Sequence, residues 1–115
     1  MVSILVVDDD KDIRFLYNHA LVKHYTIYEA STGAEALEIF KSKMPDAVIM
    51  DTSLPDANGI EVSKQILEFA GDTILIGSTG YSDKDKEFFE LGAKLVIHKP
   101  FSIADLLERV KSAIY

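Results

Sequence analysis

The stretch VSILVVDDD, residues 2–10, decides the fold of this chain. A mostly apolar run continues without a break to Val7 and then stops at three consecutive carboxylates. Short, nearly unbroken apolar runs are typical of strands that are covered on both faces of a parallel sheet. Such a strand delivers Asp8, Asp9 and Asp10 to one edge of the sheet, where their repulsion has to be offset by positive charge.

Four later segments repeat this strand pattern. AVIM (47–50), TILI (73–76) and KLVI (94–97) are short apolar runs, whereas TIYEA (26–30) alternates and suits an edge strand. Segments of helical periodicity lie between them. The alternation predicts an α/β fold of the (βα)5 type, a doubly wound five-stranded parallel sheet with helices on both faces.

The helical segments are recognised by apolar residues that recur every three or four positions. TGAE (32–35) has the pattern of a capping box and indicates where the second helix begins. The two clearest apolar stripes are Ile13, Leu16, Tyr17, Ala20 and Leu21, and Ile103, Leu106, Leu107, Val110 and Ile114.

Composition excludes several classes of function. The chain has 115 residues, of which 48% are hydrophobic and 27% charged, and this length suits one domain. Its net charge of −7 disfavours direct binding to nucleic acid or to anionic membranes. No apolar run is long enough for a membrane span, and no targeting segment is evident, so a cytoplasmic location is expected.

Polar residues follow four of the expected strands. In a doubly wound sheet, ligands bind outside the carboxyl ends of the strands. Asp8 and Asp9, Asp51, Thr79 and Lys99 stand at these ends. Oxygen ligands of this kind suit Mg²⁺, and roughly −3 from the carboxylates is balanced by +2 from the metal and +1 from the lysine.

The same residues fit phosphoryl transfer. A carboxylate can attack phosphorus to give an aspartyl phosphate, and Asp51 is the best nucleophile because it ends the central strand between the metal side and the lysine side. Transfer then needs cations and donors on the phosphoryl oxygens, for which Lys99 and Thr79 are placed. Asp10 is expected outside the site, at the start of the first helix.

Four motifs resemble those of one family. They are VVDDD (6–10), MDTSLPDANG (50–59), STG (78–80) and HKPF (98–101), each at the end of an expected strand. Together they are similar to the receiver domains of two-component response regulators, the CheY-like fold. The resemblance covers residues 1–115 as a single receiver domain and implies the flavodoxin-like strand order 2-1-3-4-5.

The resemblance also implies a role for each site residue. Asp51 matches the phosphoacceptor, and Asp8 and Asp9 match the acidic pair that binds Mg²⁺, or Mn²⁺ in its place. Ser53 matches the position whose backbone carbonyl completes the metal shell. Thr79 matches the switch hydroxyl, and Lys99 matches the conserved-type lysine, whose bond to Pro100 is cis in the family.

One position departs from the family pattern. Receiver domains usually have Tyr or Phe three residues before the lysine, and that ring moves inward when the switch hydroxyl engages the phosphoryl group. Here the residue is Val96. Valine has no ring to move, so we expect switching to depend on Thr79, on backbone movement in the loop that follows it, or on another surface.

Partners are expected on two surfaces. Phe15 and Val22 lie opposite the apolar stripe of the first helix, with Asn18 and His19 between them. In the family, a histidine kinase or histidine phosphotransferase docks at this helix, so we expect the same here. A downstream protein target is expected on the face formed by helix 4, strand 5 and helix 5.

The resulting hypothesis is a phosphoacceptor of a two-component system or phosphorelay, not a multiple-turnover enzyme. The alternative from another class is a Mg²⁺-dependent phosphohydrolase with an aspartyl nucleophile, although Ser53 stands where such enzymes commonly have a second Asp. A nucleotide- or flavin-binding protein lacks support because no Gly-rich loop follows the first strand. A receiver that works without phosphate stays open, as does the choice between a stand-alone protein and part of a longer one.

Overall fold

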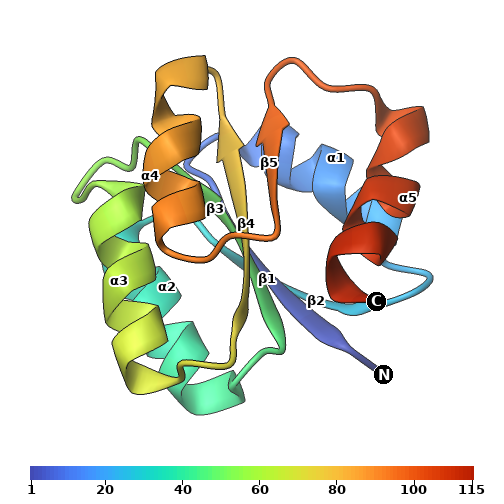
Figure 1. The fold of residues 1–115 in the computed structure, drawn as a ribbon. Coiled ribbons are helices and arrows are strands. Elements are labelled where there is room, and N and C mark those ends of the chain that lie inside the picture. Colours follow the sequence, from blue (N-terminus) through green and yellow to red (C-terminus); the bar gives the residue numbers. More distant parts are fainter.

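A computed structural model describes residues 1–115, apart from the side chain of Ser82. Five strands form one parallel sheet in the order β2-β1-β3-β4-β5 (Figure 1). This confirms the predicted fold class and strand order. The strands are β1 (Ser3–Val7), β2 (Thr26–Ala30), β3 (Ala47–Asp51), β4 (Ile74–Thr79) and β5 (Leu95–His98).

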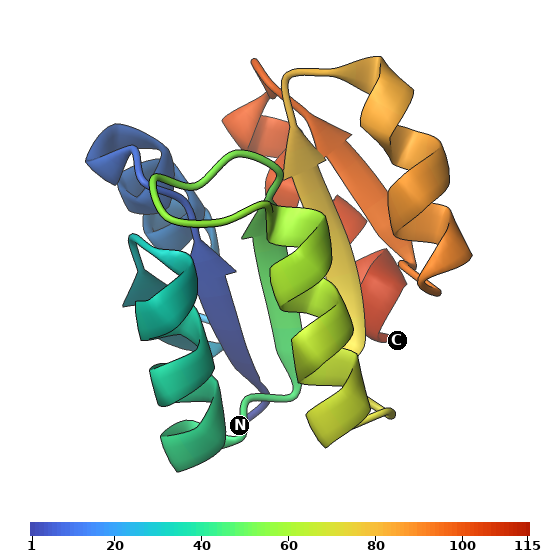
Figure 2. The same ribbon diagram turned by 90° about the vertical axis from the view of Figure 1, so that its left-hand side faces the viewer.

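Helices cover both faces of the sheet. One face carries α1 and α5, and the other carries α2, α3 and α4, as Figures 1 and 2 show from two sides. A short 3₁₀ turn, η1 (Ser82–Lys84), leads into α4. The helices are α1 (Lys11–Leu21), α2 (Gly33–Lys43), α3 (Gly59–Phe69), α4 (Asp85–Glu90) and α5 (Ile103–Ile114).

The core consists of two apolar layers, one on each side of the sheet. Alternate residues of each central strand enter opposite layers, so Leu5 and Val48 pack toward α2 and α3, whereas Ile4 and Ile49 pack toward α1 and α5. All five residues of β3 are buried. Burial on both faces explains why the β1 and β3 segments are almost continuously apolar.

Side-chain caps fix the starts of α1, α2 and α3, the last through Asn58. Asp10 accepts a hydrogen bond from the amide of Asp12, so it caps α1 and lies outside the carboxylate cluster, as predicted. Thr32 caps α2 by accepting from the amide of Glu35. The Glu35 carboxylate returns to the amide of Ser31, 2.7 Å away, instead of that of Thr32.

Two boundaries differ from the sequence-based expectations. β4 runs on to Thr79, beyond the predicted end at residue 76, because Gly77–Thr79 pair with Val96–His98 of β5. Asp51 is the last residue of β3 and pairs with Ser78. Ile103, the first residue of the expected apolar stripe, opens α5 and is 41% exposed, so the buried part of this stripe starts one turn later.

Candidate functional site

Three carboxylates meet at the carboxyl ends of β1 and β3. Asp8 and Asp51 are buried, whereas Asp9 is exposed. One oxygen from each of Asp8, Asp9 and Asp51 can be chosen so that all three lie within 4.8 Å of one another. The sequence-based expectation that these side chains converge at one edge therefore agrees with the geometry.

Lys99 reaches the cluster from the loop after β5. Its Nζ atom lies 2.7 Å from Oδ2 of Asp8 and 3.1 Å from Oδ1 of Asp51. Burial alone lowers the pKa of Lys99, but the hydrogen bond to Asp8 and the charges of Asp51 and Asp8 outweigh burial and raise it. The lysine is therefore a permanent cation at neutral pH. The peptide bond to Pro100 is cis.

Asp51, the phosphoacceptor candidate, lies where burial and a neighbouring carboxylate both disfavour its negative charge. Burial and the charge of Asp8 raise the pKa of Asp51 above its ordinary value. Lys99 and a hydrogen bond from the Ser53 backbone offset part of this effect. One ammonium group thus serves two buried carboxylates, and a third carboxylate, Asp9, stands at the rim.

The donor set fits a hard divalent cation. Carboxylate oxygens are the ligands that Mg²⁺ prefers, and Mg²⁺ keeps water molecules that an exposed rim can supply. Added positive charge also offsets the repulsion between Asp8 and Asp51 that raises the pKa of Asp51. The residues at this edge therefore fit Mg²⁺ in both ligand chemistry and charge.

The loop from β3 to α3 folds tightly beside the cluster. The amide of Gly59 donates to the carbonyl of Thr52 at 2.8 Å, and Ser53 pairs with Asn58 in an antiparallel bridge. A Cβ atom at Gly59 would lie only 1.7 Å from the carbonyl oxygen of Asp51, so this position excludes any side chain. The Ser53 backbone is consequently held in a closed loop next to Asp51.

Thr79 is engaged by a residue that the sequence analysis missed. Its side chain is buried at the end of β4, and its Oγ1 lies 3.1 Å from Oγ1 of Thr52, the residue after Asp51. The amide of Tyr81 also donates to Thr79 Oγ1, at 3.0 Å. A hydroxyl directly after the candidate nucleophile is the sequence signal that could have identified Thr52.

Three further polar contacts support the edge of the sheet. Arg14 of α1 donates through Nη1 to the backbone carbonyl of Asp8 at 2.7 Å and forms an ion pair with Glu29 of β2. The hydroxyl groups of Tyr17 and Ser78 lie 2.7 Å apart in the core. Arg14 and Glu29 are 15 positions apart and Tyr17 and Ser78 are 61 apart, so no local pattern predicts these two pairs.

Val96 is buried in β5, within the same apolar layer as Phe88 of α4. The Phe88 ring packs directly on the backbone of β4: a Cβ atom at Gly77 would lie 2.6 Å from Cδ2 of Phe88. Gly77 therefore makes room for this ring. The interior beside β4 and β5 is filled by an aromatic side chain from α4.

The two expected docking surfaces expose apolar side chains. On α1, Phe15 is 65% exposed and stacks on His19 with 6.0 Å between ring centroids, and Val22 is also exposed. On the face formed by α4, β5 and α5, Phe89 and Ile103 are exposed. Phe15 and Ile103 lie in the N-terminal halves of α1 and α5, which begin near the carboxyl ends of the strands, whereas Val22 and Phe89 lie at the opposite ends of α1 and α4.

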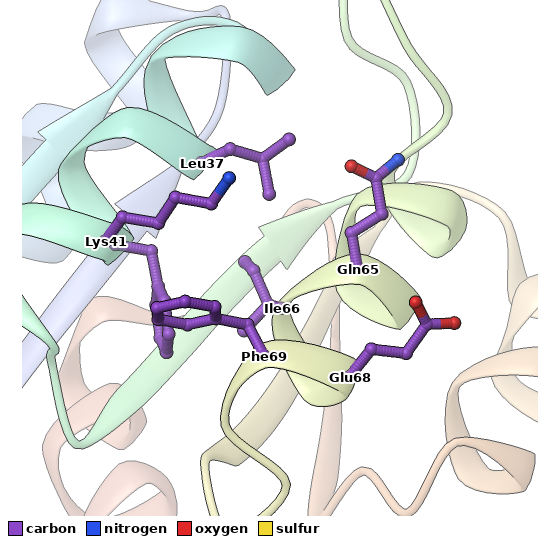
Figure 3. Close-up of a pocket in the computed structure, with 7 residues that line it drawn as sticks. Leu37, Lys41, Gln65, Ile66, Glu68 and Phe69 are labelled. Carbon is purple, nitrogen blue, oxygen red and sulfur yellow. The ribbon is translucent and has the colours of Figure 1, made fainter.

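A pocket of about 340 Å³ lies elsewhere, between the C-terminal halves of α2 and α3 (Figures 2 and 3). Lys41 and Glu68 are its charged lining residues, and Phe69 forms an apolar wall. These helices run antiparallel to the strands that precede them, so their C-terminal ends lie away from the carboxylate cluster. The chemistry expected of this protein is therefore not located in this pocket.

Fold and site together define a signalling domain of the two-component type. Residues 4–111 match the family described as response regulator receiver domain, and the chain belongs to this family. Among the residues that the structure describes, no helix has the length and apolar character needed to cross a membrane.

Relatives and solved structures agree with this assignment. Sporulation initiation phosphotransferase F of Bacillus subtilis is 36% identical over 95% of this chain and 90% of its own length. Response regulator MprA of Mycobacterium ulcerans is 33% identical over 98% of this chain, which spans only 50% of that protein. The crystal structure of a CheY-like receiver domain protein from Methanospirillum hungatei has a TM-score of 0.91 and 28% identity, covering 99% of this chain and 94% of that one.

Proposed function

We propose that this domain accepts a phosphoryl group on Asp51 from the phosphohistidine of a histidine kinase or histidine phosphotransferase. One observation carries the proposal: the Asp51 carboxylate is buried between an acidic pair and the ammonium group of Lys99, 3.1 Å away. The same set of groups is what in-line phosphoryl transfer requires. Residues 1–115 act as one receiver domain in the cytoplasm and do not turn over a separate substrate.

The chain's own residues have distinct roles in this transfer. An oxygen of the Asp51 carboxylate attacks phosphorus, the bond from phosphorus to the donor's imidazole nitrogen breaks, and the imidazole leaves with that electron pair. Lys99 places its positive charge beside the incoming phosphoryl oxygens. Thr79 donates its hydroxyl hydrogen to one of those oxygens once it leaves Thr52.

Asp8, Asp9, Asp51 and the backbone carbonyl of Ser53 would hold Mg²⁺, or Mn²⁺ in its place. When bound, the metal supplies the second cation that the phosphoryl oxygens need. The carboxylate cluster supports this part of the proposal, because three acidic groups have oxygens within 4.8 Å of one another and the ammonium group of Lys99 contacts only two of them, Asp8 and Asp51, among the described residues.

The output of the domain would come from its surface. Engagement of Thr79 by the phosphoryl group breaks its hydrogen bond with Thr52 and shifts the loop that begins at Gly80. This loop leads to η1 and α4, where Phe89 is exposed, and the neighbouring α5 exposes Ile103. A downstream protein would read this face, with no aromatic side chain available at Val96 to assist.

Intact-mass measurement with acetyl phosphate tests the proposal. With Mg²⁺ we expect a single phosphoryl adduct that hydroxylamine removes, and Asp51→Ala should lack it. EDTA should prevent its formation. Absence of the adduct under conditions where Mg²⁺ binds would indicate a receiver that works without phosphate, and repeated release of phosphate from a phosphomonoester would indicate a phosphohydrolase.

A matched pair of variants tests the docking surface. Phe15→Ala should slow transfer from a phosphohistidine donor by about tenfold, because exposed aromatic residues are frequent anchors of interfaces, and should leave phosphorylation by acetyl phosphate unchanged. Phe69→Ala is the control. Phe69 is likewise an exposed aromatic side chain, at 53%, but it lies on α3, away from α1. Equal slowing with both donors would contradict docking at Phe15.

A further inference from the structure

The loop that carries Ser53 is closed by its own backbone. Leu54 donates its amide hydrogen to the carbonyl of Ala57 at 3.1 Å, and Ser53 and Asn58 form the antiparallel bridge. Asn58 in turn caps α3 through the amide of Ile60, 2.8 Å away. These hydrogen bonds brace residues 52–59 against one another, so a contact that holds one part of the loop also restrains the Ser53 carbonyl.

Asp56 ties this unit to a different helix. Its Oδ1 accepts a hydrogen bond from the amide of Gly33 at 2.7 Å, and its Oδ2 accepts from the amide of Ala34 at 3.0 Å. These are the first two amides of α2, which have no partner within the helix. The positive end of the helix dipole further favours a carboxylate there.

The contact is charge-assisted and closely packed. Hydrogen bonds from the Gly33 and Ala34 amides lower the pKa of Asp56, so the carboxylate is ionised at neutral pH. A Cβ atom at Gly33 would lie 3.0 Å from both the Cβ of Ala57 and a methyl group of Val62, so the helix and the loop already touch. The helix itself is anchored in the core by Ala36 and Phe40.

We propose that Asp56 is a positioning residue for the divalent cation: it holds the loop against α2 and thereby fixes the Ser53 carbonyl for metal binding. The inference rests on the proposed function, because it concerns the same metal site. Mg²⁺ demands near-ideal ligand geometry, so a carbonyl that is fixed in advance raises the affinity. Asp56 touches neither the metal nor the phosphoryl group and acts through the loop.

Metal affinity separates this role from simple helix capping. Mg²⁺ binding to the unphosphorylated protein is measured by calorimetry for wild type, Asp56→Ala and Thr32→Ala. Thr32 caps the same helix by accepting a hydrogen bond from the amide of Glu35, within the helix and not from the loop. Its loss should lower the melting temperature, as removal of a helix cap does, and leave Mg²⁺ affinity unchanged.

Asp56→Ala should weaken Mg²⁺ binding by about tenfold, the lower end of what loss of outer positioning groups costs a metal site. Asp56→Asn keeps one acceptor oxygen in the same shape and should lose less affinity; it also replaces the alanine variant if that variant does not fold. Asp8→Asn serves as a reference, because it shows how much Mg²⁺ affinity is lost when a proposed direct ligand is changed.

Two outcomes would overturn the inference in distinguishable ways. If wild type binds Mg²⁺ and both Asp56 variants bind it equally well, Asp56 is a helix cap and has no part in metal binding. If wild type does not bind Mg²⁺ at all, the proposed metal site itself is wrong. An affinity ranking of wild type and Thr32→Ala above Asp56→Asn above Asp56→Ala supports the positioning role.

Discussion

An aspartate stands at each end of the central strand β3, and the two differ in solvent exposure and in the partners of their carboxylates. Asp46, just before the strand, is exposed, and its Oδ2 accepts hydrogen bonds from the Ser3 amide at 2.9 Å and the Ser3 hydroxyl at 3.3 Å. Asp51, the last residue, is buried and shares one lysine with Asp8.

The difference separates a structural carboxylate, Asp46, from the carboxylate that we propose to be reactive, Asp51. Asp46 joins β3 to the start of β1 and is satisfied by neutral donors, so its charge stays where solvent stabilises it. Asp51 carries its charge where burial and a second carboxylate oppose it. Sites that are locally unfavourable in this way are often functional, because the ligand or reaction supplies what the fold leaves out.

The largest expected effect comes from removing the partner of each carboxylate. Lys99→Met takes away the ammonium group beside Asp51 and should slow phosphorylation by acetyl phosphate roughly a hundredfold, the usual loss for one oxyanion donor. Ser3→Ala removes a side-chain partner of Asp46 and should leave the rate unchanged. Time courses of intact mass at saturating Mg²⁺ measure the phosphorylation rate of each variant. A wild-type rate in Lys99→Met would contradict the distinction drawn between Asp46 and Asp51.

A smaller, opposite pair of effects is expected on stability in EDTA. Asp51→Asn removes a buried charge that Asp8 repels, so its melting temperature should rise. Asp46→Asn weakens the bonds to Ser3, so its melting temperature should fall slightly. A change of about 1 kcal/mol moves the melting temperature by roughly 4 °C at this chain length, which thermal denaturation resolves easily. Shifts of the same sign would contradict the comparison.

The smallest expected effect is a pH dependence of the rise in melting temperature caused by Asp51→Asn. Because the pKa of Asp51 is raised in the folded state, the folded chain binds this proton more tightly than the unfolded chain does. The penalty for Asp51 is therefore complete above the raised pKa and disappears as the pH falls below the ordinary value. The difference in melting temperature between Asp51→Asn and wild type should shrink on acidification from neutral pH, and a constant difference would refute this cause.

Much of this organisation could be predicted from local sequence. The β1 and β3 segments are apolar because both faces are buried, and the residues that end them meet because parallel strands finish at one edge of the sheet. The caps at Asp10 and Thr32 follow from side chains that bond amides two or three residues away. These features depend on neighbours along the chain.

What could not be predicted depends on partners that are distant in sequence. Asp56 lies 23 positions from Gly33, and Tyr17 lies 61 positions from Ser78, so no spacing rule connects either pair. The exposure of Ile103 has a related cause, since periodicity shows which face a residue occupies but not how far the neighbouring sheet extends along the helix.

The hydrogen bond between the hydroxyl groups of Thr52 and Thr79 bears on how often the domain would become active without phosphorylation. A net hydrogen bond of about 1 kcal/mol holds a two-state equilibrium near five to one. With Thr79 in its proposed role as the switch hydroxyl, this bond would oppose activation in the absence of a signal and would set a threshold that the phosphoryl group has to exceed. In a chain with Val96 in place of the usual ring, the proposed switch would then depend on one hydroxyl pair to hold most molecules in the inactive state between signals.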